Sequence, residues 1–197
     1  MGRPRSVSDD EILAATMTAI GRHGPARLTL ANVAQEIGLS PAALVQRFGS
    51  KAGLLRAAAA RGADQAGAIF DRSRADIGSP VEALLVAMAT FAGSVTTREE
   101  LANHIAMLQL DLTQPELREQ AVAQARLLRG RIARLLVEAN AAGELDVDDP
   151  ATLADTVYTI YNGALITWAI DGSGSLTDWI RGRIRSVLAP YGVGPVT

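Results

Sequence analysis

The chain has 197 residues and no cysteine, so disulfide bonds, thiolate metal sites and cysteine nucleophiles are excluded. Hydrophobic residues, mostly Ala and Leu, make up 48% and aromatic residues only 4%, which indicates a globular protein and favours helix over sheet. No apolar run approaches the roughly 18 residues of a membrane span, and the first residues lack the apolar region of a signal peptide. We therefore expect a cytoplasmic protein without a membrane partner.

Charge is unevenly distributed along the chain, although the net charge is only −2. Residues 1–61 hold 8 basic and 4 acidic side chains, a balance of +4, whereas the remainder holds 11 basic and 17 acidic ones, a balance of −6. Phosphate attraction depends on the docking face, so the net charge does not exclude a nucleic-acid partner. A difference of this size also arises by chance.

A first helix is predicted after Ser8. Ser8 and Glu11 match a capping box, in which each side chain satisfies a backbone donor of the other residue. The predicted buried face consists of Ile12, Leu13, Thr16, Met17 and Ile20. Gly24 and the proline after it are expected to end the helix. Arg3 and Arg5 precede it on a short arm, which is either a DNA-contacting segment or a disordered terminus.

The most informative stretch is residues 29–51, with the sequence TLANVAQEIGLSPAALVQRFGSK. A short helix is predicted from an apolar stripe at spacings of three and four, formed by Leu30, Val33, Ala34 and Ile37. Gly38 suits a helix end, because glycine readily adopts positive φ. Ser40 and Pro41 suit the start of a second helix, as N-cap and first helical residue. Leu44 and Phe48 form the apolar stripe of that helix.

Two short helices joined by such a turn are typical of a helix-turn-helix motif, here residues 29–48. The second helix would project a set of side chains outward, toward a DNA major groove. These are Pro41, Ala42, Ala43, Gln46 and Arg47. The alternative is an αα-hairpin in a helical protein with no role in DNA binding.

Residues 12–55 resemble the DNA-binding segment of the TetR family of bacterial transcriptional regulators. The match rests on the helix end at His23 and Gly24, on Thr29, and on the spacing of Ala34, Gly38, Ser40, Leu44, Phe48, Ser50 and Lys51. The resemblance implies an all-α fold of about nine helices. It implies a three-helix helix-turn-helix DNA-binding domain over residues 1–55 and a helical effector-binding and dimerisation domain over residues 56–197.

The resemblance also implies roles for single residues. Thr29 and Lys51 would contact DNA phosphates, and Lys51 would do so at the start of a helix, where the helix dipole assists. Ser40 would join the outward-facing residues of the second helix in a recognition surface. The chain departs from the usual family pattern at Val45, where a tyrosine phosphate contact is common, and at Arg47, where histidine is frequent.

Beyond residue 50 the pattern predicts six more helices and no strand with period-2 alternation. The first of these is long, runs to about residue 74 and would join the two domains; a break that contains Gly78 and Pro80 follows it. Five helices then complete the chain, and the last two are expected to carry the subunit contact.

Motifs for catalysis are missing from the sequence, which has no P-loop, no G-x-S-x-G, no H-E-x-x-H and no dinucleotide fingerprint. His23 and His104 have no partners at metal-ligand spacing. Asp146, Asp148 and Asp149 lack the spacing of a calcium loop and fit a solvated acidic turn. We therefore predict no enzyme, no metal site and no cofactor.

The C-terminal part carries unusual side chains at helical spacing: Met88, Phe91, His104, Met107, Tyr158, Tyr161 and Trp168. Such a set is often ordinary core. The family resemblance implies an effector pocket between these helices, and apolar walls with a few polar groups suit a small-molecule site.

The function expected from these features is a ligand-responsive repressor. It would release a pseudo-palindromic double-stranded operator when a small-molecule effector of unknown identity binds. One recognition helix reads only a few base pairs, so we expect a homodimer. Its predicted interface includes Leu165, Trp179, Ile180, Ile184 and Leu188. The alternatives are an activator or constitutive DNA binder of the same fold, and a helical binding module without DNA function.

Overall fold

The computed structural model describes residues 7–93 and 95–193, and these form nine α-helices and a final 3-10 turn. The elements are α1 (Asp9–Arg27), α2 (Leu30–Glu36), α3 (Pro41–Phe48), α4 (Lys51–Asp76), α5 (Pro80–Ala92), α6 (Arg98–Thr113), α7 (Pro115–Ala141), α8 (Pro150–Asp171), α9 (Leu176–Leu188) and η1 (Ala189–Tyr191). Within these described ranges β-pairing is limited to one isolated bridge, between Leu145 and Gly192. The predicted all-α class is confirmed. None of the described helices combines the length and apolar character needed to cross a membrane.

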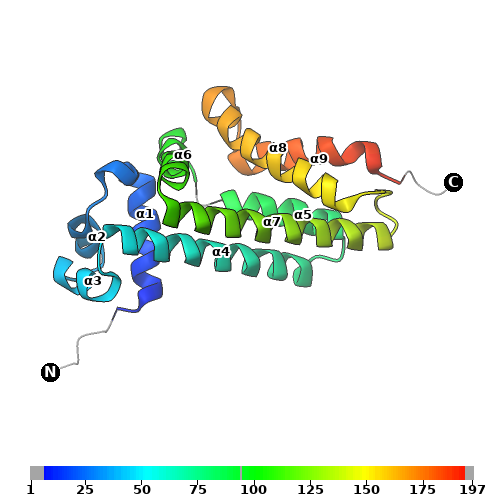
Figure 1. The fold of residues 1–197 in the computed structure, drawn as a ribbon. Helices are drawn as coiled ribbons and strands as arrows, with labels where there is room; N and C mark the ends of the chain where they lie inside the picture. The colour runs from blue at the N-terminus through cyan, green and yellow to red at the C-terminus, as the bar shows by residue number, and fades with distance from the viewer. Residues whose placement is uncertain (1–6, 94, 194–197) are drawn as a thin grey trace. The chain divides into compact units, whose positions relative to one another are not determined.

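The chain divides into two compact units. Unit 1 comprises the described residues up to Gly62 together with Glu99–Val122, and unit 2 comprises Ala63–Arg98 together with the described residues from Ala123 onward. Unit 1 therefore contains α1, α2, α3, nearly all of α6 and the first parts of α4 and α7 (Figure 1). The boundary predicted after residue 55 separates a DNA-binding domain from an effector-binding domain. The division into compact units reflects packing and does not test where these functions lie, so that boundary stays a prediction.

Unit 1 is built around one apolar cluster. Its buried members include Ile12, Ile20, Val33, Ala34, Leu44, Leu54, Leu55, Ala58 and Leu117, which come from α1, α2, α3, α4 and α7. Met107 and Leu110 of α6 pack against the same cluster. Burial of apolar area is the main stabilising contribution to such a unit. The core that supports the helix-turn-helix motif thus includes residues from much later in the chain.

Two glycines of α1 allow α6 to approach closely. The side-chain amide of Asn103 donates to the Gly21 carbonyl over 2.7 Å, and α6 lies beside the C-terminal part of α1 (Figure 1). A Cβ on Gly21 would lie 3.2 Å from Nε2 of His104, and one on Gly24 would lie 2.8 Å from Oδ1 of Asn103. Gly24 has φ 72° and ψ 158°, a region open almost only to glycine, and it kinks α1 near its end.

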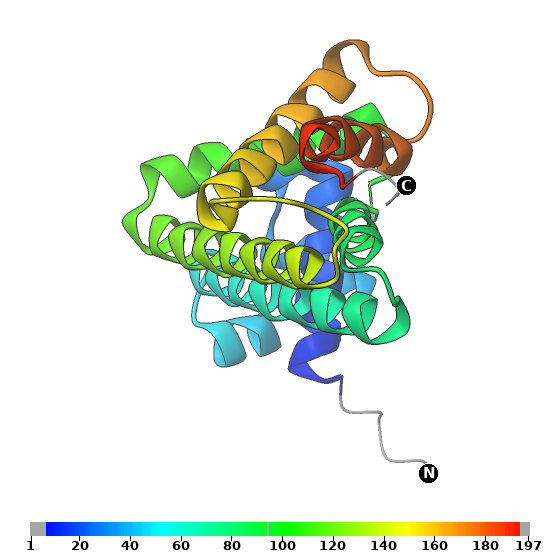
Figure 2. The same ribbon diagram turned by 90° about the vertical axis from the view of Figure 1, so that its right-hand side faces the viewer.

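In unit 2, α9 packs against both α5 and α8 (Figure 2). Its inward residues lie one turn apart and are fully enclosed: Ile180, Ile184 and Leu188. Glu82 of α5 forms ion pairs with Arg181 and Arg185 of α9, and Asp71 of α4 pairs with Arg131 of α7. Partly exposed pairs contribute only about 0–1 kcal/mol each, so apolar packing dominates the stability of this unit.

The acidic loop before α8 supplies helix caps. Asp149 accepts hydrogen bonds from the backbone N–H groups of Ala151 and Thr152, each at 3.1 Å, and hydrogen bonds from Thr152 hold the pKa of Asp149 below its usual range. Glu144 accepts a hydrogen bond from the Ser79 hydroxyl at 3.0 Å, just before α5. Among the described side chains, no group of three His, Asp, Glu or Cys residues is arranged to hold a metal ion.

Candidate nucleic-acid interface

Both helices of the 29–48 motif begin at capped ends. The Thr29 hydroxyl accepts a hydrogen bond from the Asn32 N–H at 3.1 Å, and the Asn32 side chain accepts one from the Thr29 N–H at 3.0 Å. Ser40 caps α3 by accepting from the Ala43 N–H at 3.2 Å, and Pro41 is the first helical residue. These side chains fix where α2 and α3 start, and the N-cap predicted at Ser40 is confirmed.

The turn between α2 and α3 depends on Gly38, whose φ is 67°. The N–H of Leu39 donates to the Ala34 carbonyl at 2.9 Å, which closes the turn. Ala34 and Leu44 are 1% and 0% exposed, so the two helices touch through a small and a large apolar residue. The geometry holds α3 firmly against α2 with one face directed outward.

The outward face of α3 is weakly polar. Leu44 is buried and Phe48 packs against the unit 1 core, so the opposite side of the helix is free. The exposed residues are Ser40, Pro41, Ala42, Val45, Gln46 and Arg47, and Ala43 is half-buried at the edge. This is the surface that a groove of duplex DNA would meet.

Arg47, the only charged residue of α3, is bound within unit 1. One guanidinium nitrogen, Nη1, donates to the Val7 carbonyl at 2.7 Å and to the carboxylate of Asp9 at 3.2 Å. Asp9 lies 38 residues earlier in the chain, so no local sequence pattern could have revealed this contact. The predicted base-reading arginine is therefore attached to the start of α1.

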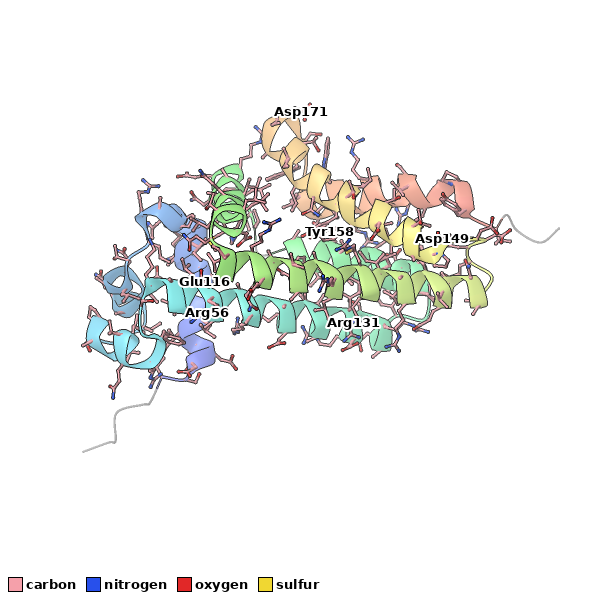
Figure 3. The ribbon with its side chains drawn as sticks, viewed as in Figure 1. Arg56, Glu116, Arg131, Asp149, Tyr158 and Asp171 are labelled. Carbon is pink, nitrogen blue, oxygen red and sulfur yellow. The ribbon has the colours of Figure 1, made fainter. Side chains whose placement is uncertain are left out.

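Other basic side chains of unit 1 also have partners within it. Lys51 donates from Nζ to the Pro25 carbonyl at 2.8 Å, and Arg61 pairs with Asp10 at 3.2 Å. Arg56 is exposed on α4 (Figure 3). Arg3 and Arg5 of the predicted arm lie outside the described residues.

The predicted effector-pocket residues are divided between the units. Unit 2 holds five of them: Met88, Phe91, Tyr158, Tyr161 and Trp168. The rings of Phe91 and Tyr161 lie 6.0 Å apart, and the Arg129 guanidinium lies 5.7 Å above the ring of Tyr158. Burial, and to a smaller extent Tyr158, raises the pKa of the Tyr161 phenol well above its usual value. Tyr161 is therefore a buried, neutral phenol whose ring lies near that of Phe91.

The other two predicted pocket residues, His104 and Met107, belong to unit 1. Met107 packs against the apolar cluster there, and His104 lies against Gly21. Burial lowers the pKa of His104, while the nearby Glu100 acts in the opposite direction. The imidazole is therefore mainly neutral at neutral pH.

Unit 2 contains two hollows, and neither is lined by the predicted effector-pocket residues. One of about 390 Å³ lies between α5 and α9, lined by Val86, Ala89, Thr90, Gly93, Thr177, Asp178 and Arg181. One of about 220 Å³ lies between α4 and α7, lined by Phe70, Asp71, Arg74, Ala75, Arg131, Arg134, Leu135 and Glu138. None of the predicted pocket residues lines either hollow. The pocket assignment stays a prediction.

The predicted dimer residues mostly face inward. Ile180, Ile184 and Leu188 are at most 3% exposed in the single chain, so they have almost no surface for a partner. Leu165 and Trp179 are half-buried, and the Arg183 guanidinium lies 4.2 Å above the Trp179 ring. The outward side of α8 exposes other large apolar residues: Ile166 at 44% and Ile170 at 73%. An interface on these helices stays a prediction, with these two residues as its exposed candidates.

The compact core, the tight α2–α3 turn and the exposed face of α3 define unit 1 as a helix-turn-helix regulator domain. Residues 12–58 match the sequence profile described as "Bacterial regulatory proteins, tetR family". A TetR-family transcriptional regulator from Rhodococcus sp. has a similar structure, with TM-score 0.71, 25% identity, and coverage of 91% of this chain and 97% of that chain. No curated protein sequence matches the chain.

Two solved structures with lower sequence identity to this chain have the same fold. A TetR transcription regulator from Haloarcula marismortui has TM-score 0.79 and 17% identity over 94% of this chain and 98% of that chain. A transcriptional regulator from Saccharomonospora viridis in complex with choline has TM-score 0.74 and 21% identity over 92% and 95%. The family match over residues 12–58 and the structure from Rhodococcus sp. support a TetR-family transcriptional regulator, and regulators of this family are DNA-binding proteins and not enzymes.

Proposed function

We propose that this regulator is a homodimeric repressor that releases its operator when a small molecule binds in the helical region outside the helix-turn-helix motif. The observation that carries the DNA-binding part is the exposed face of α3, held outward by the capped α2–α3 turn. Each subunit would place α3 in the major groove, and two subunits would read half-sites about 34–36 Å apart.

Phosphate contacts would position α3 in the groove. Thr29 and Ser40 stand exposed at the starts of α2 and α3, where free backbone N–H groups favour anions. Lys51 opens α4, and its ammonium already reaches the Pro25 carbonyl at 2.8 Å. On DNA the same ammonium would bind a phosphate. These contacts would set the orientation of α3 and carry no sequence information.

Lys51→Ala is expected to weaken binding to all duplex sequences alike. Each phosphate contact that is lost should reduce the slope of log affinity against log salt by about 0.9. The measurement is fluorescence anisotropy with labelled duplexes at several salt concentrations.

Arg56→Ala is the matched control, because it removes an exposed positive charge further along α4. It should change the salt slope less than Lys51→Ala. Equal salt slopes for Lys51→Ala and the parent protein would contradict the phosphate role of Lys51. Salt-independent binding by the parent protein would contradict the proposed function itself.

The effector part of the proposal rests on Tyr161 and its surroundings. A buried phenol next to the Phe91 ring offers a polar group in an apolar region, which suits a small organic ligand. The similarly folded Saccharomonospora viridis regulator holds choline, which supports a small-molecule role for this fold. Within unit 1, the bond from Asn103 to Gly21 ties α6 to α1. A ligand that moves α6 would thereby move the DNA-binding helices.

Tyr161→Phe is expected to reduce the small molecule that co-purifies with the protein, without changing operator affinity. Loss of one hydrogen bond worth about 0.5–1.5 kcal/mol corresponds to about a two- to twelvefold loss in ligand affinity. The ligand is released by denaturation and quantified by mass spectrometry. Tyr158→Phe is the control, since Tyr158 is only half-buried and lies under Arg129. If Tyr161→Phe retains as much ligand as the parent protein, Tyr161 does not bind the ligand and is an ordinary residue of the hydrophobic core.

A further inference from the structure

The chemistry of the exposed α3 face indicates which bases it recognises, if the proposed DNA binding is correct. Exposed Gln46 carries the only amide of the helix, and exposed Ala42 and Val45 carry methyl groups. Val45 is 46% exposed, so its methyl groups are available for contact. The outward surface of α3 therefore offers one bidentate hydrogen-bonding group within an otherwise apolar area.

Arg47 is positioned differently from these residues. Its Nη1 donates both to the Val7 carbonyl, at 2.7 Å, and to Asp9, at 3.2 Å, and its side chain is 35% exposed. These bonds join the C-terminal part of α3 to the first turn of α1. Arg61 of α4 binds the neighbouring Asp10 at 3.2 Å, so the start of α1 is attached to α3 and to α4. Arg47 acts here as a brace between helices.

Arginine, glutamine and aliphatic side chains prefer different bases in the major groove. Arginine pairs bidentately with guanine O6 and N7, whereas glutamine pairs bidentately with adenine N6 and N7. Aliphatic side chains contact the C5-methyl group of thymine. With Arg47 bound to Val7 and Asp9, the side chains left on the free face suit adenine and thymine.

We propose that α3 recognises an A·T-rich half-site: Gln46 pairs with an adenine, Ala42 and Val45 contact thymine methyl groups, and Arg47 is a positioning residue that holds α1 against α3. This revises the expectation that Arg47 reads a base. It rests on the proposed function and adds to it the class of operator sequence that the recognition helix binds.

The experiment begins with selection of bound duplexes from a random pool by the full-length chain. The selected half-site should be rich in A·T pairs. Replacing the A·T pair under Gln46 by G·C should weaken binding about 5- to 150-fold for the parent protein and hardly at all for Gln46→Ala. Replacing the contacted thymines by deoxyuridine removes one methyl group each and should weaken binding about fourfold per methyl.

Three variants test the role of Arg47. Arg47→Ala and Asp9→Ala should weaken binding to all duplexes by a similar factor without changing the preferred bases. Arg47→Lys should recover part of the binding, because an ammonium also donates to a carbonyl and a carboxylate, although it lacks the planar fork of the guanidinium. Asp10→Ala is the matched control, since Asp10 occupies the same first turn but binds Arg61. Circular dichroism and thermal unfolding confirm that each variant is folded.

The outcomes separate this inference from the proposed function. A guanine-led half-site whose guanine preference is lost in Arg47→Ala and kept in Asp9→Ala would overturn the inference and leave DNA binding intact. Failure to enrich any sequence, together with salt-independent retention, would overturn the proposed function as well. Enrichment of A·T pairs that Gln46→Ala no longer distinguishes would support both.

Discussion

Ile166→Glu is expected to separate the two subunits while each stays folded. Ile166 is 44% exposed on the outward side of α8 in the single chain, so a carboxylate there remains hydrated in a monomer. In a dimer with two-fold symmetry the charge is present on both partners and would be buried near its own copy. Specific DNA affinity should fall by about 10³-fold or more, toward the non-specific level, because a monomer reads only one half-site. Light scattering after size exclusion measures the mass, and circular dichroism the helix content.

Ile184→Glu is the matched comparison, and it should unfold unit 2. Ile184 is 0% exposed beneath α5 and α8, and a carboxylate enclosed there without a partner costs more than most domains can tolerate. A folded dimeric Ile184→Glu variant would contradict the packing of α9 described here. An Ile166→Glu variant that remains dimeric would place the subunit contact on another surface.

Gly24→Ala is expected to destabilise unit 1. Gly24 has φ 72° and ψ 158°, where a residue with a Cβ is strained by about 1–3 kcal/mol. The new methyl group would also lie 2.8 Å from Oδ1 of Asn103, whose amide nitrogen bonds to the Gly21 carbonyl. Thermal unfolding should therefore shift to lower temperature, and DNA affinity should fall because α6 no longer fits against α1.

Gly130→Ala provides the control for a glycine in ordinary helix. Gly130 lies within α7, with no atom within 4 Å of the position that a Cβ would occupy. Alanine there should raise stability by about 0.4–1 kcal/mol, because the unfolded chain loses freedom and the native helix is not strained. If Gly24→Ala is as stable as the parent protein, the contact between α1 and α6 is not as close as the geometry indicates.

Local features of the fold were predictable from the sequence because they depend on residues a few positions apart. The capping box at Ser8 and Glu11, the turn at Gly38 and the cap at Ser40 all occur where the pattern predicted them. In each case the interacting groups lie within about one helical turn of each other in the sequence. Such interactions are encoded locally, and sequence spacing is sufficient to recognise them.

Contacts between distant segments were not predictable in this way. Arg47 is exposed, as the sequence indicated, but its hydrogen bonds to Val7 and Asp9, in α1 or just before it, could not be anticipated. Periodicity also cannot tell which neighbour an apolar stripe faces, so Ile184 was assigned to a subunit contact although it lies in the monomer core. Similarly, the sequence could not indicate that His104 lies next to Gly21, 83 positions earlier in the chain. Only the folded arrangement distinguishes these possibilities.

The composition of the unit 1 core has a consequence for how this protein can change its target. Leu117 of α7 and Met107 and Leu110 of α6 complete an apolar cluster that begins with residues of α1. A recombination event with a crossover near residue 55 would join α1, α2 and α3 to foreign versions of these side chains and leave gaps or overlaps in the core. The DNA-binding part is therefore not a portable segment. Substitution on the exposed face of α3, which touches little of that core, is the easier route by which descendants of such a gene acquire new operators.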